Sequence, residues 1–287
     1  MENSQHPKVS VLIVTFNNSR TIKDCLDSLI NQDSNEIEIL VFDNNSTDRT
    51  IAILNNYELI NVVESSRNLG FAATVNRLAA LAKGEFLFIL NPDCQCPPGL
   101  IKSLLAFAQQ HPGAISPALT FPDGSIQPSA REFPDYNNII FARRSPLYLL
   151  GFKRLKNAGF ITPSGPTRVP VVSATALLVP KKIFDEIGRF DERFFLYFED
   201  IDLCKRLNQK GIDIWYLPDI KIIHQLRASS QRRSFKALFY HHLSVFKYFT
   251  KHYPQRYIKN SMLAGLLLIS YAISALFMVL IPRRSND

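Results

Sequence analysis

A chain of 287 residues can bury one sizeable core, and 46% apolar residues exclude a largely disordered protein. The formal net charge of +8 favours anionic partners such as phosphate-bearing substrates or acidic phospholipids, with ordinary solubility as the alternative. Residues 1–9 are polar and predict no secretory signal. The cysteines lack the spacing of a zinc site, so we expect reduced thiols in a cytoplasmic domain.

The N-terminal part of the chain alternates predicted strands with predicted helices. Continuous apolar runs predict buried strands at residues 9–15, 36–42, 59–63 and 85–90. Helices are predicted between them, at residues 21–31, after Ser46 and at residues 71–82. A strand, helix, strand order implies parallel pairing, so we expect a doubly wound, mostly parallel sheet flanked by helices.

The alternation stops after a helix that ends near His111. Residues 117–134 carry an Asp123-Gly124 turn between short extended pieces, which predicts a hairpin. Residues 135–167 are expected to form a variable loop region with some helix. Further strands are predicted at residues 169–179, 213–216 and 220–224, and helices at 181–187 and 199–210.

The C-terminal third is first basic and then apolar. Residues 234–253 predict an amphipathic helix with Lys and His on its polar side. Residues 262–281 carry no charge, are long enough to cross a bilayer and are flanked by Lys259 and Arg283. They predict a membrane helix, and a helix buried against the protein or a partner is the alternative. Basic residues directly before this stretch favour a membrane surface over nucleic acid.

These patterns divide the chain into three parts. We expect an α/β domain over residues 1–230, a basic amphipathic segment over 231–260, and an apolar helix with its tail over 261–287.

Polar side chains follow two of the predicted strands. Asn91-Pro92-Asp93 follows the strand at 85–90, and Asp43 begins a polar turn after the strand at 36–42. Open α/β sheets bind ligands at the carboxyl ends of their strands, and these side chains suit a hydroxylated, metal-bound substrate such as a nucleotide sugar. Residues 15–19 lack the glycines of a dinucleotide-binding turn, and the chain has no triphosphate-binding loop, so dehydrogenases and ATPases are disfavoured.

Five motifs in this order resemble the bacterial family 2 glycosyltransferases, especially the rhamnosyltransferase-like subgroup. They are VSVLIVTFN (9–17), VFDNNSTD (41–48), RNLGFA (67–72), NPD (91–93) and FDERFFLYFEDIDL (190–203), and the resemblance covers residues 8 to about 224. It implies an α/β fold of the GT-A type, a nucleoside-diphosphate sugar donor, Mg²⁺ or Mn²⁺, and inversion at the anomeric carbon.

The resemblance assigns the donor site. Asp43 looks like the carboxylate that accepts a hydrogen bond from N3–H of uracil or thymine, and a turn or helix-capping role is the alternative. Five more residues are placed at the donor: Thr15, Asn17, Asn68, Gly70 and Asn91. A plain helix entry explains Asn68 and Gly70 nearly as well.

The resemblance also assigns a metal site. Asp93 is the expected cation ligand, since a hard oxygen donor suits Mg²⁺ or Mn²⁺. The family's usual motif here is Asp-x-Asp, with two carboxylates. In this sequence Asn91 replaces the first Asp, so we expect weaker metal binding. His224 resembles the histidine that completes this site in some relatives. The alternatives are a capping role for Asp93 and a structural, hydrogen-bonded role for His224.

Two carboxylates follow an aromatic run and are candidates for the general base. Apolar neighbours raise a carboxylate's pKa toward neutrality, which improves it as a base. We expect Asp200 to be the base and Glu199 to bind the acceptor sugar; compensation of the helix dipole is the alternative. Arg131 is expected to contact a donor or acceptor phosphate, unless it is an ordinary surface arginine.

The sequence therefore predicts an inverting, metal-dependent glycosyltransferase at the cytoplasmic face of a bacterial plasma membrane. It would transfer a sugar, with L-rhamnose suggested by the resemblance alone, from a dTDP- or UDP-sugar to a hydroxyl of a lipid-linked cell-surface glycan. Residues 135–167 would face this acceptor. No nucleic acid partner is expected, and the oligomeric state is left open. A non-catalytic nucleotide-sugar-binding subunit and a nucleotidyltransferase are the alternatives.

Overall fold

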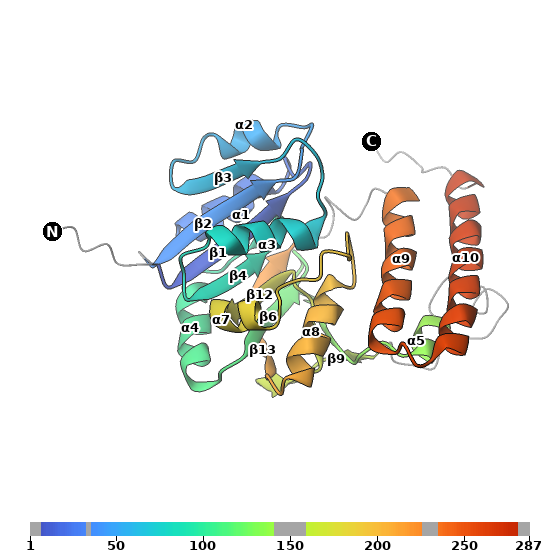
Figure 1. The fold of residues 1–287 in the computed structure, drawn as a ribbon. Helices are drawn as coiled ribbons and strands as arrows, with labels where there is room; N and C mark the ends of the chain where they lie inside the picture. The colour runs from blue at the N-terminus through green and yellow to red at the C-terminus, as the bar shows by residue number, and fades with distance from the viewer. Residues whose placement is uncertain (1–6, 33–35, 141–158, 226–234, 281–287) are drawn as a thin grey trace.

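The computed structural model describes residues 7–32, 36–140, 159–225 and 235–280 (Figure 1). Its first half alternates β1 (Val9–Thr15), α1 (Ile22–Ile30), β2 (Ile37–Asp43), α2 (Thr50–Leu54), β3 (Ile60–Glu64), α3 (Phe71–Leu81) and β4 (Phe86–Leu90). The four strands lie in the order β4-β1-β2-β3 and pair in parallel. This confirms the predicted doubly wound half of the sheet.

The register of these strands brings their polar ends together. Thr15 of β1 pairs with Asp43 of β2, and Asp43 in turn pairs with Glu64 of β3. Side chains alternate between the two faces of the sheet: Leu12 joins the core under α3, while Val11 and Ile13 join the core under α1. Both faces are therefore buried, as the continuous apolar runs require.

The second half extends the sheet through mixed pairing. Beyond β4 the order is β12 (Ala176–Pro180), β6 (Ala114–Thr120), β13 (Ile214–His224) and β10 (Thr167–Arg168), with β12 antiparallel to both neighbours and β6 parallel to β13. Two short strands, β5 (Cys94–Gln95) and β7 (Ile126–Gln127), pair with β13 and β6.

Sequence reasoning placed only a short extended piece from Pro117 onward and missed the full strand β6, although all seven of its residues are buried. Ser116 and Pro117 interrupt its apolar run, and proline is disfavoured inside a sheet. The structure tolerates Pro117 because its partner strand β13 has a register irregularity between Leu217 and Lys221, directly beside it. The same irregularity explains why β13 was predicted as two strands.

The predicted strand at 169–179 is wrong, because it divides between two sheets. Val171–Val172 forms β11 in a small sheet of order β11-β8-β9, with β8 (Ala130–Arg131) and β9 (Phe160–Ile161), whereas Ala176–Pro180 is β12 of the main sheet. The predicted hairpin is confirmed: Phe121 N–H donates to Ser125 O at 2.8 Å across the turn between β6 and β7.

Within the described residues, the helices that follow are α4 (Leu100–Gln110), α5 (Tyr136–Ile140), α7 (Lys181–Glu186), α8 (Glu199–Gln209), α9 (Phe235–His252) and α10 (Tyr257–Leu280). Much of the predicted loop region, residues 141–158, lies outside the described residues. The last two helices form an antiparallel hairpin that stands beside the sheet domain, with α9 between that domain and α10 (Figure 1). The predicted apolar helix starts earlier than expected, at Tyr257 instead of Met262.

Candidate active site

Asp43, at the carboxyl end of β2, is buried and accepts three hydrogen bonds. Its Oδ1 accepts from Thr15 Oγ1 at 2.8 Å and Ser46 Oγ at 2.6 Å, and its Oδ2 accepts from Ser46 N–H at 2.7 Å. These are the contacts of the turn role that the sequence left as the alternative. Oδ2 accepts only this one bond within the described residues, so one of its lone pairs remains for a further donor. Recognition of the base requires such an acceptor.

Asn17 ties the end of β1 to the turn after β2. Its backbone N–H donates to Ser46 Oγ at 2.8 Å, and its side-chain Oδ1 accepts from Thr47 N–H at 2.8 Å. Asn17 has φ = 58°, a left-handed conformation that asparagine tolerates better than most residues. Thr15, Asn17 and Asp43 thus form one hydrogen-bonded floor at the strand ends.

Gly70, at the start of α3, is where the aromatic segment of residues 194–198 approaches the sheet domain. It has φ = 83°, and a Cβ there would lie 2.6 Å from Phe195 O. Phe71 N–H donates to the same carbonyl at 3.0 Å, and Asn68 Oδ1 accepts from Gly70 N–H at 2.9 Å. Asn68 and Gly70 therefore show the helix-entry role, and the glycine is required for this close approach.

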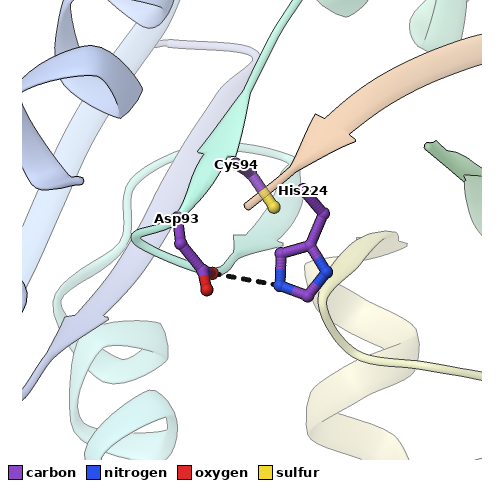
Figure 2. Close-up of side chains that lie close together, drawn as sticks. All are labelled: Asp93, Cys94 and His224. Atoms are coloured by element: carbon purple, nitrogen blue, oxygen red, sulfur yellow. Dashed lines mark ion pairs between the residues drawn. The ribbon is translucent and has the colours of Figure 1, made fainter. Parts of the chain in front are cut away.

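Asp93 and His224 meet at the carboxyl end of β4 (Figure 2). Asp93 Oδ1 lies 3.1 Å from His224 Nε2, and both side chains are buried. Among the described residues, Asp93 Oδ2 has no hydrogen-bond partner. Pairing of β5 with β13, and a hydrogen bond from Gln225 N–H to Asp93 O at 2.8 Å, fix this juxtaposition. The expected metal pair is brought together.

The donor set fits a hard divalent cation. The carboxylate oxygen suits Mn²⁺ and Mg²⁺, whereas the imidazole nitrogen favours a transition metal such as Mn²⁺ over Mg²⁺. A buried carboxylate oxygen without a partner among the described residues is the group that such a cation would satisfy. Gln127 Oε1 lies 3.0 Å from His224 Nδ1 and orients the ring. Cys94 lies in the same group, but burial raises the pKa of its thiol well above the ordinary value, and its Sγ contacts Thr175 O at 3.8 Å. Asp93 and His224 are therefore the ligands that fit.

Asn91 lies in the same turn, between β4 and β5. Its backbone N–H donates to Thr175 O at 2.8 Å, and its carbonyl accepts from Cys94 N–H at 3.2 Å. Its side chain is half-buried beside the metal pair. The main chain of Asn91 thus fixes the turn that carries Asp93.

The acidic pair begins α8. Glu199 is buried, and burial raises its pKa to about 8, with the neighbouring charge of Asp200 adding to the effect and Arg131 opposing it. Glu199 Oε2 has no hydrogen-bond partner among the described residues. We expected the aromatic segment to raise the pKa of the general base, Asp200. In the structure the carboxyl group with a near-neutral pKa is that of Glu199.

Arg131 is not an isolated surface arginine. Its Nη2 lies 3.6 Å from Asp200 Oδ2, and β8 holds it in place through pairing with β11 and β9. Asp200 Oδ1 accepts from Ile201 N–H at 2.8 Å, so the carboxylate is also held at the start of α8. The small sheet and α8 together position one cation beside the two carboxyls.

Sequence reasoning missed His241 of α9, which it left outside the α/β domain. The imidazole packs edge-on against Tyr197 and Phe198, with ring centroids 5.6 and 6.1 Å apart. Neighbouring protein atoms, with His242 and Arg131 adding to the effect, lower the pKa of His241, and the exposure of this residue to solvent limits the shift. The adjacent His241-His242 on a lysine-bearing helix is the only sequence signal for it.

A model of the family described as Glycosyl transferase family 2 matches residues 10–187. The chain belongs to this family. The transferase is 31% identical over 259 residues to N-acetylglucosaminyl-diphospho-decaprenol L-rhamnosyltransferase of Mycobacterium tuberculosis, covering 82% of each chain. It is 28% identical to Rhamnosyltransferase WbbL of Escherichia coli, covering 85% of this chain and 93% of the relative.

Solved structures confirm the fold. The transferase superposes with a TM-score of 0.62 and 19% identity on GalNAc-T7, crystallised with UDP, GalNAc and Mn²⁺. The match covers 85% of this chain and 48% of that longer one. This match confirms the predicted GT-A-like sheet. The family match and the two rhamnosyltransferase relatives confirm the assignment as a rhamnosyltransferase-like glycosyltransferase.

Proposed function

We propose that this glycosyltransferase moves L-rhamnose from a dTDP- or UDP-sugar to a hydroxyl of a lipid-linked cell-surface glycan, with inversion. The observation that carries the proposal is the buried Asp93–His224 pair at the carboxyl end of β4, in which Asp93 Oδ2 has no hydrogen-bond partner within the described part of the chain. The name of the mycobacterial relative supports the sugar and the diphospho-polyprenol acceptor. A divalent cation held by Asp93 and His224 would stabilise charge on the departing diphosphate.

The remaining steps fall to the chain's own side chains. Asp200 would accept the proton of the acceptor hydroxyl as it attacks the face opposite the leaving group. Arg131, 3.6 Å from Asp200, would hold this carboxylate in place and meet acceptor phosphate. Glu199, protonated at neutral pH because its pKa is about 8, would donate a hydrogen bond to the acceptor sugar.

The donor would lie over the strand ends. Asp43 would accept from N3–H of the base through its remaining lone pair, with Thr15 and Asn17 shaping the turn below it. Asn68, Gly70 and Asn91 would line the sugar nucleotide. Residues 1–230 would form the catalytic domain, and the two C-terminal segments, 231–260 and 261–287, would hold it at the cytoplasmic face of the bacterial plasma membrane.

The test is nucleoside-diphosphate release from a panel of dTDP- and UDP-sugars, with Mn²⁺, Mg²⁺ or EDTA and native lipids as acceptor. We expect cation-dependent release from one donor, and its loss in Asp93→Ala and Asp200→Ala. Donor binding without release under every condition would contradict the proposal and indicate a non-catalytic subunit.

The assignment of His224 as a metal ligand is tested separately, with Cys94 as the control. His224→Ala should weaken Mn²⁺ binding to the donor-bound protein by at least about tenfold, because it removes a ligand. Cys94→Ser should leave Mn²⁺ affinity nearly unchanged, since a soft thiol suits a hard cation poorly and the Cys94 Sγ contacts Thr175 O. Calorimetric titration measures both. Equal losses in the two variants would show that Cys94 is a ligand.

A further inference from the structure

We propose that α10 lies along the membrane surface with its outer apolar side in the bilayer and does not cross it. This rests on the membrane attachment of the proposed function and specifies its geometry. The helix alone permits crossing, because it has 24 residues and a mean hydropathy of 2.4, with 6% of its most apolar window buried. The packing of α10 on α9 decides otherwise.

One side of α10 packs against α9 along much of its length. His242 Nε2 lies 3.2 Å from Ser270 Oγ, and Phe239 packs against Tyr271. At the other end of the hairpin, Asn260 Nδ2 donates to Tyr253 O at 3.0 Å, and Asn260 Oδ1 accepts from Tyr136 Oη at 2.7 Å. Contacts from Asn260 to Tyr271 hold the two helices side by side, as Figure 1 shows.

The opposite side of α9 contacts the catalytic domain. Ser244 Oγ donates to Leu196 O at 2.9 Å, and Lys247 Nζ donates to Arg193 O at 2.5 Å. Lys251 Nζ lies 2.7 Å from Asp191 and 2.5 Å from buried Asp202. α9 is therefore clamped between α10 and the domain.

This clamp is incompatible with a crossing α10. Residues 260–271 of α10 lie level with residues 239–253 of α9, so hydrocarbon around the first would surround the second. The charges of Lys247, Lys251, Asp191 and Asp202 would then enter the bilayer core, where ionised groups are strongly disfavoured. With α10 parallel to the membrane, the same charges stay on the aqueous side.

The outer side of α10 has the composition of a bilayer contact. Its exposed large apolar residues extend over the whole length of the helix and are Tyr257, Ile258, Met262, Leu268, Ile269, Leu276, Phe277, Val279 and Leu280. No charged residue occurs between Asn260 and Leu280, whereas Arg256 and Lys259 are exposed at the start of the helix. Cations beside an uncharged apolar stripe fit anionic headgroups above acyl chains. A second protein copy would not call for this charge placement.

The proposal is tested by determining on which side of the membrane each end of the chain lies, in the 287-residue protein expressed in bacteria. Ser4→Cys and Asp287→Cys place a thiol near each end of the chain, and the native cysteines Cys25, Cys94, Cys96 and Cys204 are all buried, which keeps background labelling low. A membrane-impermeant maleimide should label both variants in inverted vesicles and neither in intact spheroplasts. Labelling of Asp287→Cys in intact spheroplasts would overturn the in-plane arrangement.

A second measurement tests the contact face. Leu268→Glu with Leu276→Glu should move the protein from the membrane to the soluble fraction, with an unchanged melting temperature, since both side chains are exposed. Leu59→Glu is the matched control, because Leu59 is 73% exposed on a distant loop and should leave the protein in the membrane fraction. Retention of the double variant on membranes would contradict the assignment.

Two outcomes separate this inference from others. A wild-type protein that is fully soluble as a dimer, and monomeric in the double variant, would show that a second copy covers α10 and would overturn the proposal. Neither assay reads sugar transfer. If both thiols were labelled from the cytoplasmic side and the protein showed no sugar transfer, the result would contradict the proposed function and still support this inference.

Discussion

At the scale of single residues, the active-site region is organised by buried polar groups with few partners. Asp93 and Glu199 each have one carboxyl oxygen without a hydrogen-bond partner among the described residues. Such groups cost stability in the free enzyme, since a buried acceptor has lost its water. They are therefore where a cation and a hydroxylated substrate would gain most.

Glu199 gives a pH-dependent prediction. Its pKa rises from 4.5 to about 8 on folding, so the fold favours its neutral form and this stability is lost as pH rises through 8. Relative to wild type, Glu199→Gln should be similar at pH near 4 and more stable by roughly 2–4 kcal/mol above pH 9. Urea denaturation measures this, with exposed Glu58→Gln as control. A difference that does not change with pH would contradict the assigned burial.

Gly70 gives a prediction about close packing. Gly70→Ala should destabilise the protein by about 2–3 kcal/mol, because it combines a positive φ with a Cβ 2.6 Å from Phe195 O. Gly124→Ala is the matched control: φ is also positive, at 82°, but no atom lies within 4 Å, so only about 1 kcal/mol is expected. Thermal unfolding compares the two, and equal losses would argue against the contact with residue 195.

At the scale of elements, the junction of α8 with α9 controls the placement of the acidic pair. Asp202, one turn into α8, is fully buried and receives Arg206 at 2.9 Å and His252 at 2.8 Å as well as Lys251. Burial alone would raise the pKa of Asp202, but these partners lower it. The first turn of α8, which carries Glu199 and Asp200, is thereby fixed relative to α9 and its His241.

Removing this carboxylate should be costly. Asp202→Ala removes the buried carboxylate that cations of two helices share, and we expect a loss of about 3 kcal/mol or more in the free energy of unfolding. Glu186→Ala is the control, because its pair with Lys182 is exposed, at 3.9 Å, and should cost at most about 0.5 kcal/mol. Denaturant titration distinguishes them. A loss of less than about 1 kcal/mol in the first variant would show that the Asp202 carboxylate contributes little to the attachment of α9.

At the scale of the whole molecule, net charge and the apolar helix would act together in the proposed membrane binding. Raising salt from about 0.1 M to 1 M shortens the Debye length from about 10 Å to about 3 Å, which should weaken the approach of this +8 protein to anionic vesicles. Protein already bound through α10 should resist the same salt. Co-sedimentation with phosphatidylglycerol vesicles, with salt added before or after mixing, measures both; release by salt afterwards would mean that attachment is electrostatic alone.

The local pattern of the sequence determined the N-terminal half of the fold. Uninterrupted apolar strands and intervening amphipathic helices admit one arrangement, a parallel sheet buried on both faces, and so place Asp43 and Asp93 at the carboxyl ends of their strands. The five motifs identified the family, because their order along the chain is itself sequence information.

Tertiary structure decided what depends on pairing between distant segments. The sequence predicted the hairpin after Pro117, but not that β6 runs through this proline inside the main sheet, because the irregularity in β13 that accommodates it lies a hundred residues later. The pKa of Glu199 and the place of His241 depend on how α8, α9 and the small sheet meet, and no spacing encodes that. Composition made α10 apolar, but its packing on α9 decides which way it faces, since burial and charge compensation are properties of neighbours in space.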